Sequence, residues 1–253
     1  MFHAPVRWSW RRERMKRWLR IVGLAEYGGD ELLIAALACG AMAWALALAL
    51  GPWTALVALV PWAIVLWFFR DPERRVPDRP DALLSPADGR VQDIQEVDAP
   101  SYLGGRALRI GIFLSPLDVH VNRAPCEGTV EHLRYLAGEF LPAYNPRAPE
   151  RNEAVELGLV TPLGMRVLVK QIAGMLARRI VCAVRPGARL ARGARYGMIK
   201  FGSRTELYVP LDAGFRASVR VGDRVRGGET VLLEREERPA AAAPDAQAQE
   251  AHP

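Results

Sequence analysis

A charge-free stretch of 38 residues, from position 32 to position 69, constrains this 253-residue chain more than any other feature. Gly51-Pro52 divides the stretch into legs of 19 and 17 residues. Proline lacks an amide N–H and disfavours helix in the residue before it, so we expect the chain to turn there. At 1.5 Å per residue each leg is about 26–28 Å long, close to the ~30 Å hydrocarbon core of a bilayer. The pattern predicts a hydrophobic helical hairpin over residues 30–69 that inserts into a membrane.

Basic residues flank both ends of this hairpin. Residues 1–25 carry seven Lys and Arg against Glu13 alone, which accounts for the whole net charge of +6. Residues 1–29 are therefore predicted to be a basic segment next to anionic headgroups. Because basic flanks stay on the cytoplasmic side, we expect a cell-membrane protein with its body in the cytoplasm. A neutral body argues against nucleic acid as a partner. A buried hairpin in a soluble core and a shallow monotopic hairpin remain alternatives.

Residues 70–237 differ in texture, with short β-branched runs separated by Gly, Pro and Asp. Such runs predict strands, for example over residues 108–114 and 165–169. Residues 219–232 alternate and turn at glycines, which predicts a β-hairpin. The expected fold is mainly β, a compact sandwich or barrel-like catalytic domain, and α+β overall with the N-terminal helical hairpin. Residues 238–253 lack periodicity and are expected to be a disordered tail.

Polar clusters in apolar surroundings are the candidates for chemistry. Three scattered cysteines and four histidines give no disulfide framework and no metal-ligand spacing, so we expect no metal. Each cluster is weak alone: Asp88 before Gly89 is a turn signal, and His120 between two valines also fits a buried β-face. The clusters are residues 85–89, 115–123, 171–181 and 200–204.

Taken together and in this order, the clusters resemble the short form of phosphatidylserine decarboxylase over about residues 60–235. The resemblance implies a pyruvoyl-dependent carbon–carbon lyase (carboxy-lyase) of phospholipid biosynthesis, which converts phosphatidylserine to phosphatidylethanolamine without a metal. The motifs that carry it are FFRDP (68–72), SPADGRV (85–91), FLSPLDVHVNR (113–123), residues 171–182 and IKFGSR (199–204).

The resemblance also implies a zymogen that makes its own cofactor by autocatalytic cleavage between Gly202 and Ser203. Ser203 would attack the Gly202 carbonyl, and elimination and hydrolysis would leave a pyruvoyl group on residue 203. That group would form a Schiff base with the amine of the substrate. The large chain 1–202 and the small chain 203–253 would stay together as a heterodimer. Whether heterodimers associate further stays open.

Roles for individual residues follow from the same resemblance. Ser203, Asp88 and His120 are implied to be catalytic, and Lys200, Arg204 and Arg123 are candidates for binding substrate. Some relatives carry a second histidine where this chain has Arg123, so the base for self-cleavage stays open.

Two other functions fit parts of the sequence. Residues 222–228 resemble the hairpin of a biotinyl or lipoyl carrier domain, with Lys200 as the modified lysine. A membrane-tethered adaptor domain without self-cleavage is the other possibility. The carrier domain gives the Asp88 and His120 clusters no purpose, and the neighbours of Lys200 do not match a carrier flank. The adaptor would need outward charged clusters to bind partners, yet the body is neutral overall. A mass measurement separates the three: two chains, one modified chain or one unmodified chain.

Overall fold

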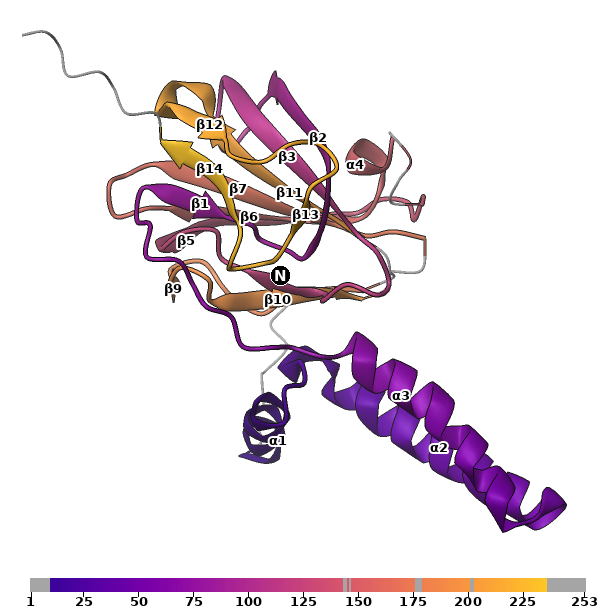
Figure 1. The fold of residues 1–253 in the computed structure, drawn as a ribbon. Coiled ribbons are helices and arrows are strands. Elements are labelled where there is room, and N and C mark those ends of the chain that lie inside the picture. The colour runs from indigo at the N-terminus through magenta and orange to yellow at the C-terminus, as the bar shows by residue number, and fades with distance from the viewer. Residues whose placement is uncertain (1–9, 143–144, 146, 176–178, 201–202, 236–253) are drawn as a thin grey trace, which may run out of the picture.

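A helical N-terminal part and a β-rich body make up the chain (Figure 1). The structure is a computed structural model that describes residues 10–142, 145, 147–175, 179–200 and 203–235. The predicted disordered tail over 238–253 and the Gly202 side of the predicted cleavage site lie outside the described residues. The predicted fold class, mainly β with a helical hairpin, is confirmed.

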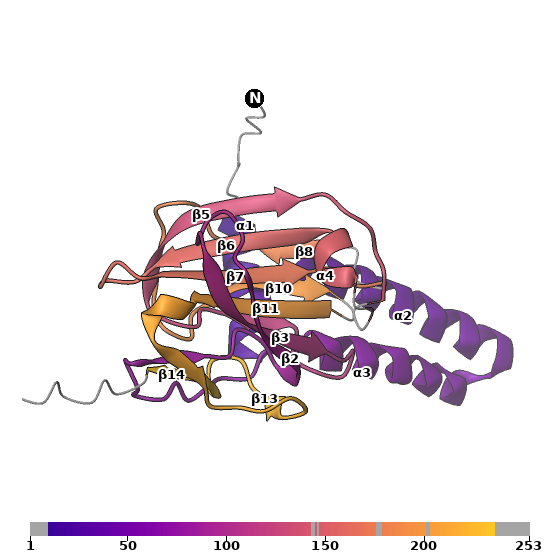
Figure 2. The same ribbon diagram turned by 90° about the horizontal axis from the view of Figure 1, so that it is seen from above.

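The two apolar legs form the hairpin and project away from the body in both views (Figure 1, Figure 2). The first leg is α2 (Gly29–Leu50), and the second is η2 (Pro52–Ala58) followed by α3 (Leu59–Phe68). Gly51 turns the chain with φ 100°, a conformation that residues with a Cβ rarely adopt. The hydroxyl of Thr54 donates to the carbonyl of Leu46 across the turn at 2.8 Å. The turn therefore lies where the Gly-Pro pair predicts it.

The hairpin surface is apolar and exposed. Among the described residues one helical stretch, Glu26–Leu50, is long and apolar enough to cross a membrane by length and composition. The second leg is shorter. Large apolar side chains of both legs are exposed, and soluble monomers rarely expose an apolar surface of this kind. Examples are Leu37, Trp44, Leu48, Val60 and Ile64.

The base of the hairpin is fastened to the body. The helices α1 (Trp10–Ile21) and η1 (Glu26–Gly28) precede the hairpin, and the segment between them pairs with its end. Ala25 N donates to Phe69 O, and Asp71 N donates to Gly23 O, both at 2.7 Å. Phe68 and Phe69 are buried in one cluster with side chains of α1, α2 and the body: Leu19, Leu32, Val119, Val121 and Met198.

The strands of the body form three antiparallel sheets that share one core. The largest, β13-β2-β3-β11-β7-β6-β5-β9, curls around the core in Figure 2. The smaller sheets are β1-β14-β12 and β4-β10-β8. The bounds are β1 (Ala82–Leu84), β2 (Gly89–Asp98), β3 (Arg106–Leu114), β4 (Val121–Arg123), β5 (Gly128–Leu136), β6 (Ala154–Val160), β7 (Arg166–Ile172), β8 (Arg179–Cys182), β9 (Arg189–Leu190), β10 (Arg195–Lys200), β11 (Ser203–Pro210), β12 (Phe215–Ala217), β13 (Arg224–Val225) and β14 (Val231–Arg235), with short helices α4 (Ala148–Arg151) and η3 (Leu211–Ala213).

The hairpin predicted over residues 219–232 does not form. β13 pairs with β2, whereas β14 pairs with β1 and β12. Gly222 N donates to Val91 O, and Val91 N donates to Asp223 O, at 2.8 and 2.9 Å. The backbone groups of this segment are thus used by β2, so alternation along the chain identified strands but not their partners.

Candidate active site

Ser203 begins β11, a strand that is hydrogen-bonded on both sides. Its residues pair with β3 (Ser203 with Leu114) and, from Arg204 on, with β7. The Ser203 side chain is fully buried, and its Oγ has no hydrogen-bond partner among the described residues. Most buried polar groups in folded proteins are hydrogen-bonded, so an unsatisfied buried hydroxyl is a notable exception.

β4 brings His120 to the same place. β10 runs antiparallel to β4, and Ile199 N donates to His120 O at 3.2 Å. The chain from Asn122 back to His120 runs alongside β10 toward its last residue, Lys200, and two residues then separate β10 from β11. The Asn122 side chain donates to Thr205 Oγ1 at 3.2 Å, and Ser203 lies two residues nearer that same connection. His120 and Ser203 each lie two residues before this Asn122–Thr205 contact along the chain, so both belong to the segments that meet there.

The imidazole of His120 is buried and neutral. Nδ1 lies 2.9 Å from Asp118 O, and since a carbonyl only accepts, Nδ1 carries the proton. Nε2 is then the acceptor, and it has no partner among the described residues. Phe68 covers the ring at a centroid distance of 4.5 Å. Burial lowers the pKa of His120 to about 4, with Arg70 acting in the same direction. At neutral pH the ring is therefore uncharged and has an acceptor nitrogen that no other described residue uses.

Asp88 lies in the turn between β1 and β2, which packs beside β4. Arg123 N donates to Pro86 O at 2.9 Å and fixes that turn. The carboxylate of Asp88 accepts from Arg74 at 2.7 Å and from Gly227 N at 2.8 Å. Burial raises the pKa of Asp88 against the opposing charge of Arg74. Its partners among the described residues are these two groups, neither of which is His120 or Ser203.

Three buried polar side chains connect the strands behind the site. Gln171 Nε2 donates to Asn122 Oδ1 at 2.8 Å, and Asn122 in turn donates to Thr205. All three are fully buried, and Gln171 Oε1 has no partner among the described residues. The sequence motifs contain Asn122 and Gln171, but nothing in their spacing indicates that β4, β7 and β11 meet there. The only available signal was their polarity within buried runs.

The three candidates for binding substrate already have carboxylate partners. Lys200 Nζ is 2.6 Å from Glu31 of α2, and the lysine is buried. The substrate-binding roles stay predictions. The other two pairs are Arg123 with Asp71 at 2.8 Å, and Arg204 with Asp93 and Glu206 at 2.6 and 2.8 Å.

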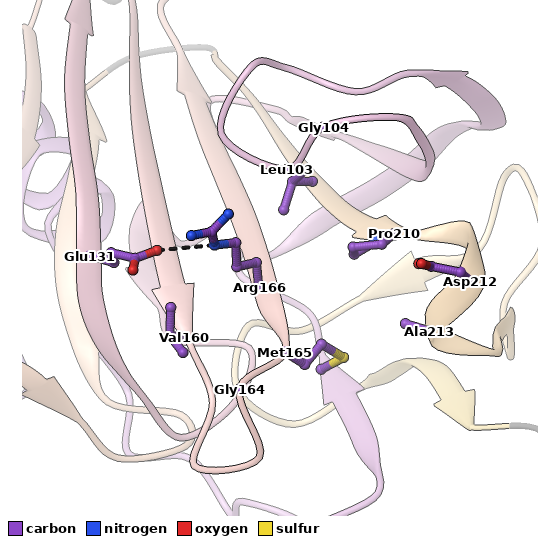
Figure 3. A pocket seen from close by; sticks show the side chains of 10 residues that line it. All are labelled: Leu103, Gly104, Glu131, Val160, Gly164, Met165, Arg166, Pro210, Asp212 and Ala213. Carbon is purple, nitrogen blue, oxygen red and sulfur yellow. Dashed lines mark hydrogen bonds and ion pairs between the residues drawn. The ribbon is translucent and has the colours of Figure 1, made fainter.

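Two surface pockets lie away from this site. The first, of about 510 Å³, is lined by the turn before β7 and by the end of β11 at Pro210, where Arg166 and Glu131 pair with each other at 3.2 Å (Figure 3). Seven residues of strand, about 23 Å, separate Pro210 from Ser203. The second, of about 500 Å³, includes Pro77, Cys126, Arg192 and Arg235. No group of three or more His, Cys, Asp or Glu in the described ranges could hold a metal ion.

Comparison with known proteins identifies the family. The family model described as "Phosphatidylserine decarboxylase" matches residues 62–233. The phosphatidylserine decarboxylase proenzyme of Symbiobacterium thermophilum is 52% identical over 168 residues, 66% of this chain and 77% of that protein. That of Salinibacter ruber is 53% identical over 172 residues, 67% and 75% of the two chains. That of Chlorobium phaeobacteroides is 41% identical over 209 residues, 81% and 97% of the two chains. The chain belongs to the phosphatidylserine decarboxylase family.

Membership confirms the resemblance seen in the sequence and makes the chain a carboxy-lyase by family. The match begins in α3 and ends in β14, so it includes every residue of the candidate site. The family match does not support the alternative of a biotinyl or lipoyl carrier domain. The buried, ion-paired Lys200 is not presented to a modifying enzyme as a carrier lysine must be.

The buried His120 predicts a pH dependence of stability. Its pKa is about 4 in the folded protein and near 6.5 when unfolded, so between these values only the unfolded chain binds the proton. The free energy of unfolding should therefore fall as the pH falls through this window, by about 3 kcal/mol. Urea unfolding in neutral detergent between pH 7 and pH 4 measures it. His120→Gln should remove this contribution to the dependence of the free energy of unfolding on pH. The control is His132→Gln, at a half-buried histidine. An unchanged slope in His120→Gln would contradict the assignment.

Proposed function

We propose that this chain is a phosphatidylserine decarboxylase proenzyme that cuts itself before Ser203 and converts that residue into a pyruvoyl group. One observation carries the proposal: among the described residues Ser203 Oγ and His120 Nε2 are both buried without partners, and each residue lies two positions before the Asn122–Thr205 hydrogen bond that joins β4 and β11. Leaving such groups unsatisfied costs about 1–3 kcal/mol each. A use in catalysis accounts for that cost, and both residues fit the formation of the group.

Self-cleavage begins with the serine hydroxyl as nucleophile. His120 Nε2 takes the proton of Ser203 Oγ as the oxygen attacks the carbonyl carbon of Gly202, and the peptide bond is exchanged for an ester. Removal of the α-proton of residue 203 then expels the Gly202 carboxylate and leaves a dehydroalanine. Addition of water releases ammonia and leaves a ketone at the new end of the small chain. No oxidant or metal takes part in these steps.

The pyruvoyl group supplies the carbonyl that binds the substrate amine and the electron sink for loss of CO2. The residues of this chain orient the substrate and manage protons. His120, neutral at neutral pH, can hold the proton that must return to Cα of the product. The apolar wall formed by Phe68 suits a carboxylate that has to lose its charge.

Asp88 is assigned to the processing step. Its carboxylate is held by Arg74, which precedes β1, and by Gly227, which lies between β13 and β14. Gly227 belongs to the segment after the predicted cut, and Asp88 belongs to the segment before it. This link favours a role in shaping the site during cleavage over direct contact with the lipid.

We further propose that the hairpin inserts into the cytoplasmic membrane, with the body in the cytoplasm. The exposed apolar legs and the basic flanks support insertion and this orientation. The large chain 1–202 and the small chain 203–253 would remain together, because β11 lies in the middle of the largest sheet.

Ser203→Ala should leave one uncut chain without decarboxylase activity, because the hydroxyl supplies both the nucleophile and the atoms of the pyruvoyl group. Intact mass under denaturing conditions measures the number of chains, and CO2 release measures activity. Ser218→Ala, in the loop after β12, is the control and should be cut normally. Two chains from the Ser203 variant would show that the cleavage site is misplaced.

His120→Ala should slow self-cleavage and turnover about 10²-fold or more each, because one neutral base serves both steps. Asp88→Asn should slow mainly self-cleavage, and the fraction that matures should keep part of its activity. Band-resolved cleavage over time, with CO2 release normalised to the cleaved fraction, separates the two steps. Normal cleavage in His120→Ala with turnover lost would remove His120 from processing.

Charges placed on the hairpin should release the protein from membranes. Leu37→Arg combined with Val60→Arg puts one arginine on each exposed leg, at about 2.5–3.5 kcal/mol each near a bilayer centre. The measurement is the amount left in carbonate-washed membranes, with cleavage followed on the same gel. Tyr135→Arg, exposed on the body, is the control and should stay in the membrane. Full retention of the double variant would contradict insertion.

A further inference from the structure

Among the described basic side chains at the candidate site, that of Arg70 has no carboxylate partner. Lys200, Arg123, Arg204 and Arg74 are each paired with a carboxylate at 3.3 Å or less. Arg70 makes no ion pair among the described residues. It is half-buried, and burial lowers its pKa against the longer-range charges of Asp88 and Asp118. A desolvated cation without a counterion is a place where an anionic ligand gains binding energy.

The backbone at Arg70 is held on both sides. Arg70 forms an antiparallel bridge with Leu24, and the peptide groups before and after it are hydrogen-bonded to the segment after α1. Its guanidinium donates to Trp67 O at 2.8 Å and to Leu117 O at 2.6 Å. The guanidinium carbon also lies 4.2 Å from the centroid of the Trp67 ring. These contacts fix the charge while using only part of the five N–H donors of an arginine.

Arg70 and His120 are held by neighbouring carbonyls of one loop. Arg70 donates to Leu117 O, and the His120 ring is bonded to Asp118 O. Phe68, two residues before Arg70, covers the imidazole. Trp67 is exposed at the end of α3, where the apolar hairpin meets the body. A ligand anchored on Arg70 therefore lies next to the exposed Trp67 at the end of the hairpin and next to the loop that holds His120.

We propose that Arg70 binds the phosphodiester of the lipid substrate and so positions the serine headgroup toward residue 203. The proposal rests on the proposed decarboxylase function. The phosphodiester is favoured over the substrate carboxylate for a chemical reason. The carboxylate loses its charge as CO2 leaves, so a paired cation would stabilise the ground state more than the transition state. The phosphodiester keeps its charge throughout, so a fixed cation there binds both states equally.

A purely structural role is the alternative, because the bond from Arg70 to Trp67 O caps the C-terminus of α3. The two roles predict different substrate dependence. Loss of a cap lowers stability and affects any substrate alike, whereas loss of a phosphodiester contact affects only substrates that contain the phosphate.

The experiment compares Arg70→Gln, Arg70→Lys and the control Arg75→Gln, an exposed arginine five residues on. KM and kcat are measured on the cleaved fraction in neutral detergent, with phosphatidylserine and with an O-alkylserine lipid that keeps the amine and carboxylate but lacks the phosphate. Arg70→Gln should raise KM for phosphatidylserine about tenfold to hundredfold with kcat nearly unchanged. KM for the O-alkylserine lipid should change less than twofold. KM of Arg70→Lys for phosphatidylserine should lie between that of the parent and that of Arg70→Gln, and KM of Arg75→Gln should match that of the parent.

Equal rises in KM for both lipids, or a fall in kcat alone, would overturn the proposal. Binding to the uncut Ser203→Ala protein gives a readout that needs no turnover. In this protein, dihexanoyl phosphatidylserine below its micelle concentration should bind at least tenfold more weakly when Arg70→Gln is added, and the affinity with Arg70→Lys should lie between that of Arg70→Gln and that of the Ser203→Ala parent. Unchanged binding in both variants would also overturn the proposal. Failure of the decarboxylase function would appear separately, as a parent protein that is not cut and releases no CO2.

Discussion

The buried carboxylate of Asp71 holds together the parts of the molecule that make the site. It accepts hydrogen bonds from Arg123 of β4 and from Arg195 of β10, and the backbone of Asp71 is bonded to Gly23. β4 follows directly on His120, and β10 leads to Ser203. One side chain thus ties the base of the hairpin to both strands. Removing one partner of a buried ion pair typically costs about 3–5 kcal/mol, so hairpin, histidine and serine are energetically linked.

This interaction also accounts for Arg123. Its guanidinium donates to Asp71, to Pro72 O and to Gly193 O. From sequence alone Arg123 was a candidate for binding substrate. Its actual partner, Asp71, lies 52 positions earlier in the chain. Local spacing cannot indicate such a pairing. The other histidine among the described residues, His132, pairs with Glu156 at 3.3 Å, whereas His120 Nε2 has no partner there.

Features that depend on neighbouring residues could be predicted from the sequence. Gly51-Pro52 fixed the hairpin turn, because one residue supplies a positive φ and the other cannot continue a helix. The short β-branched runs at 108–114 and 165–169 predicted strands where β3 and β7 lie. What failed was pairing: residues 219–232 were expected to fold on themselves, yet β13 joins β2. For the same reason the contact of Gln171 with Asn122 and Thr205 could not be foreseen, and neither could the unpaired charge of Arg70. These depend on which distant strands become neighbours.

The place of β11 in the sheet has a consequence for the lifetime of the protein. It is hydrogen-bonded to β3 along its whole length and to β7 along part of it, and its residues are almost all buried. β12 and β14 occupy a second sheet with β1, and β13 extends the first sheet beside β2. A cut before Ser203 would therefore leave a small chain whose strands belong to two sheets that also contain strands of the large chain. Such fragments cannot dissociate without unfolding the core, and the large fragment alone would lack a central strand. Unfolding would then be irreversible after maturation, because the two separate chains of the cut protein would have to find each other again in order to refold.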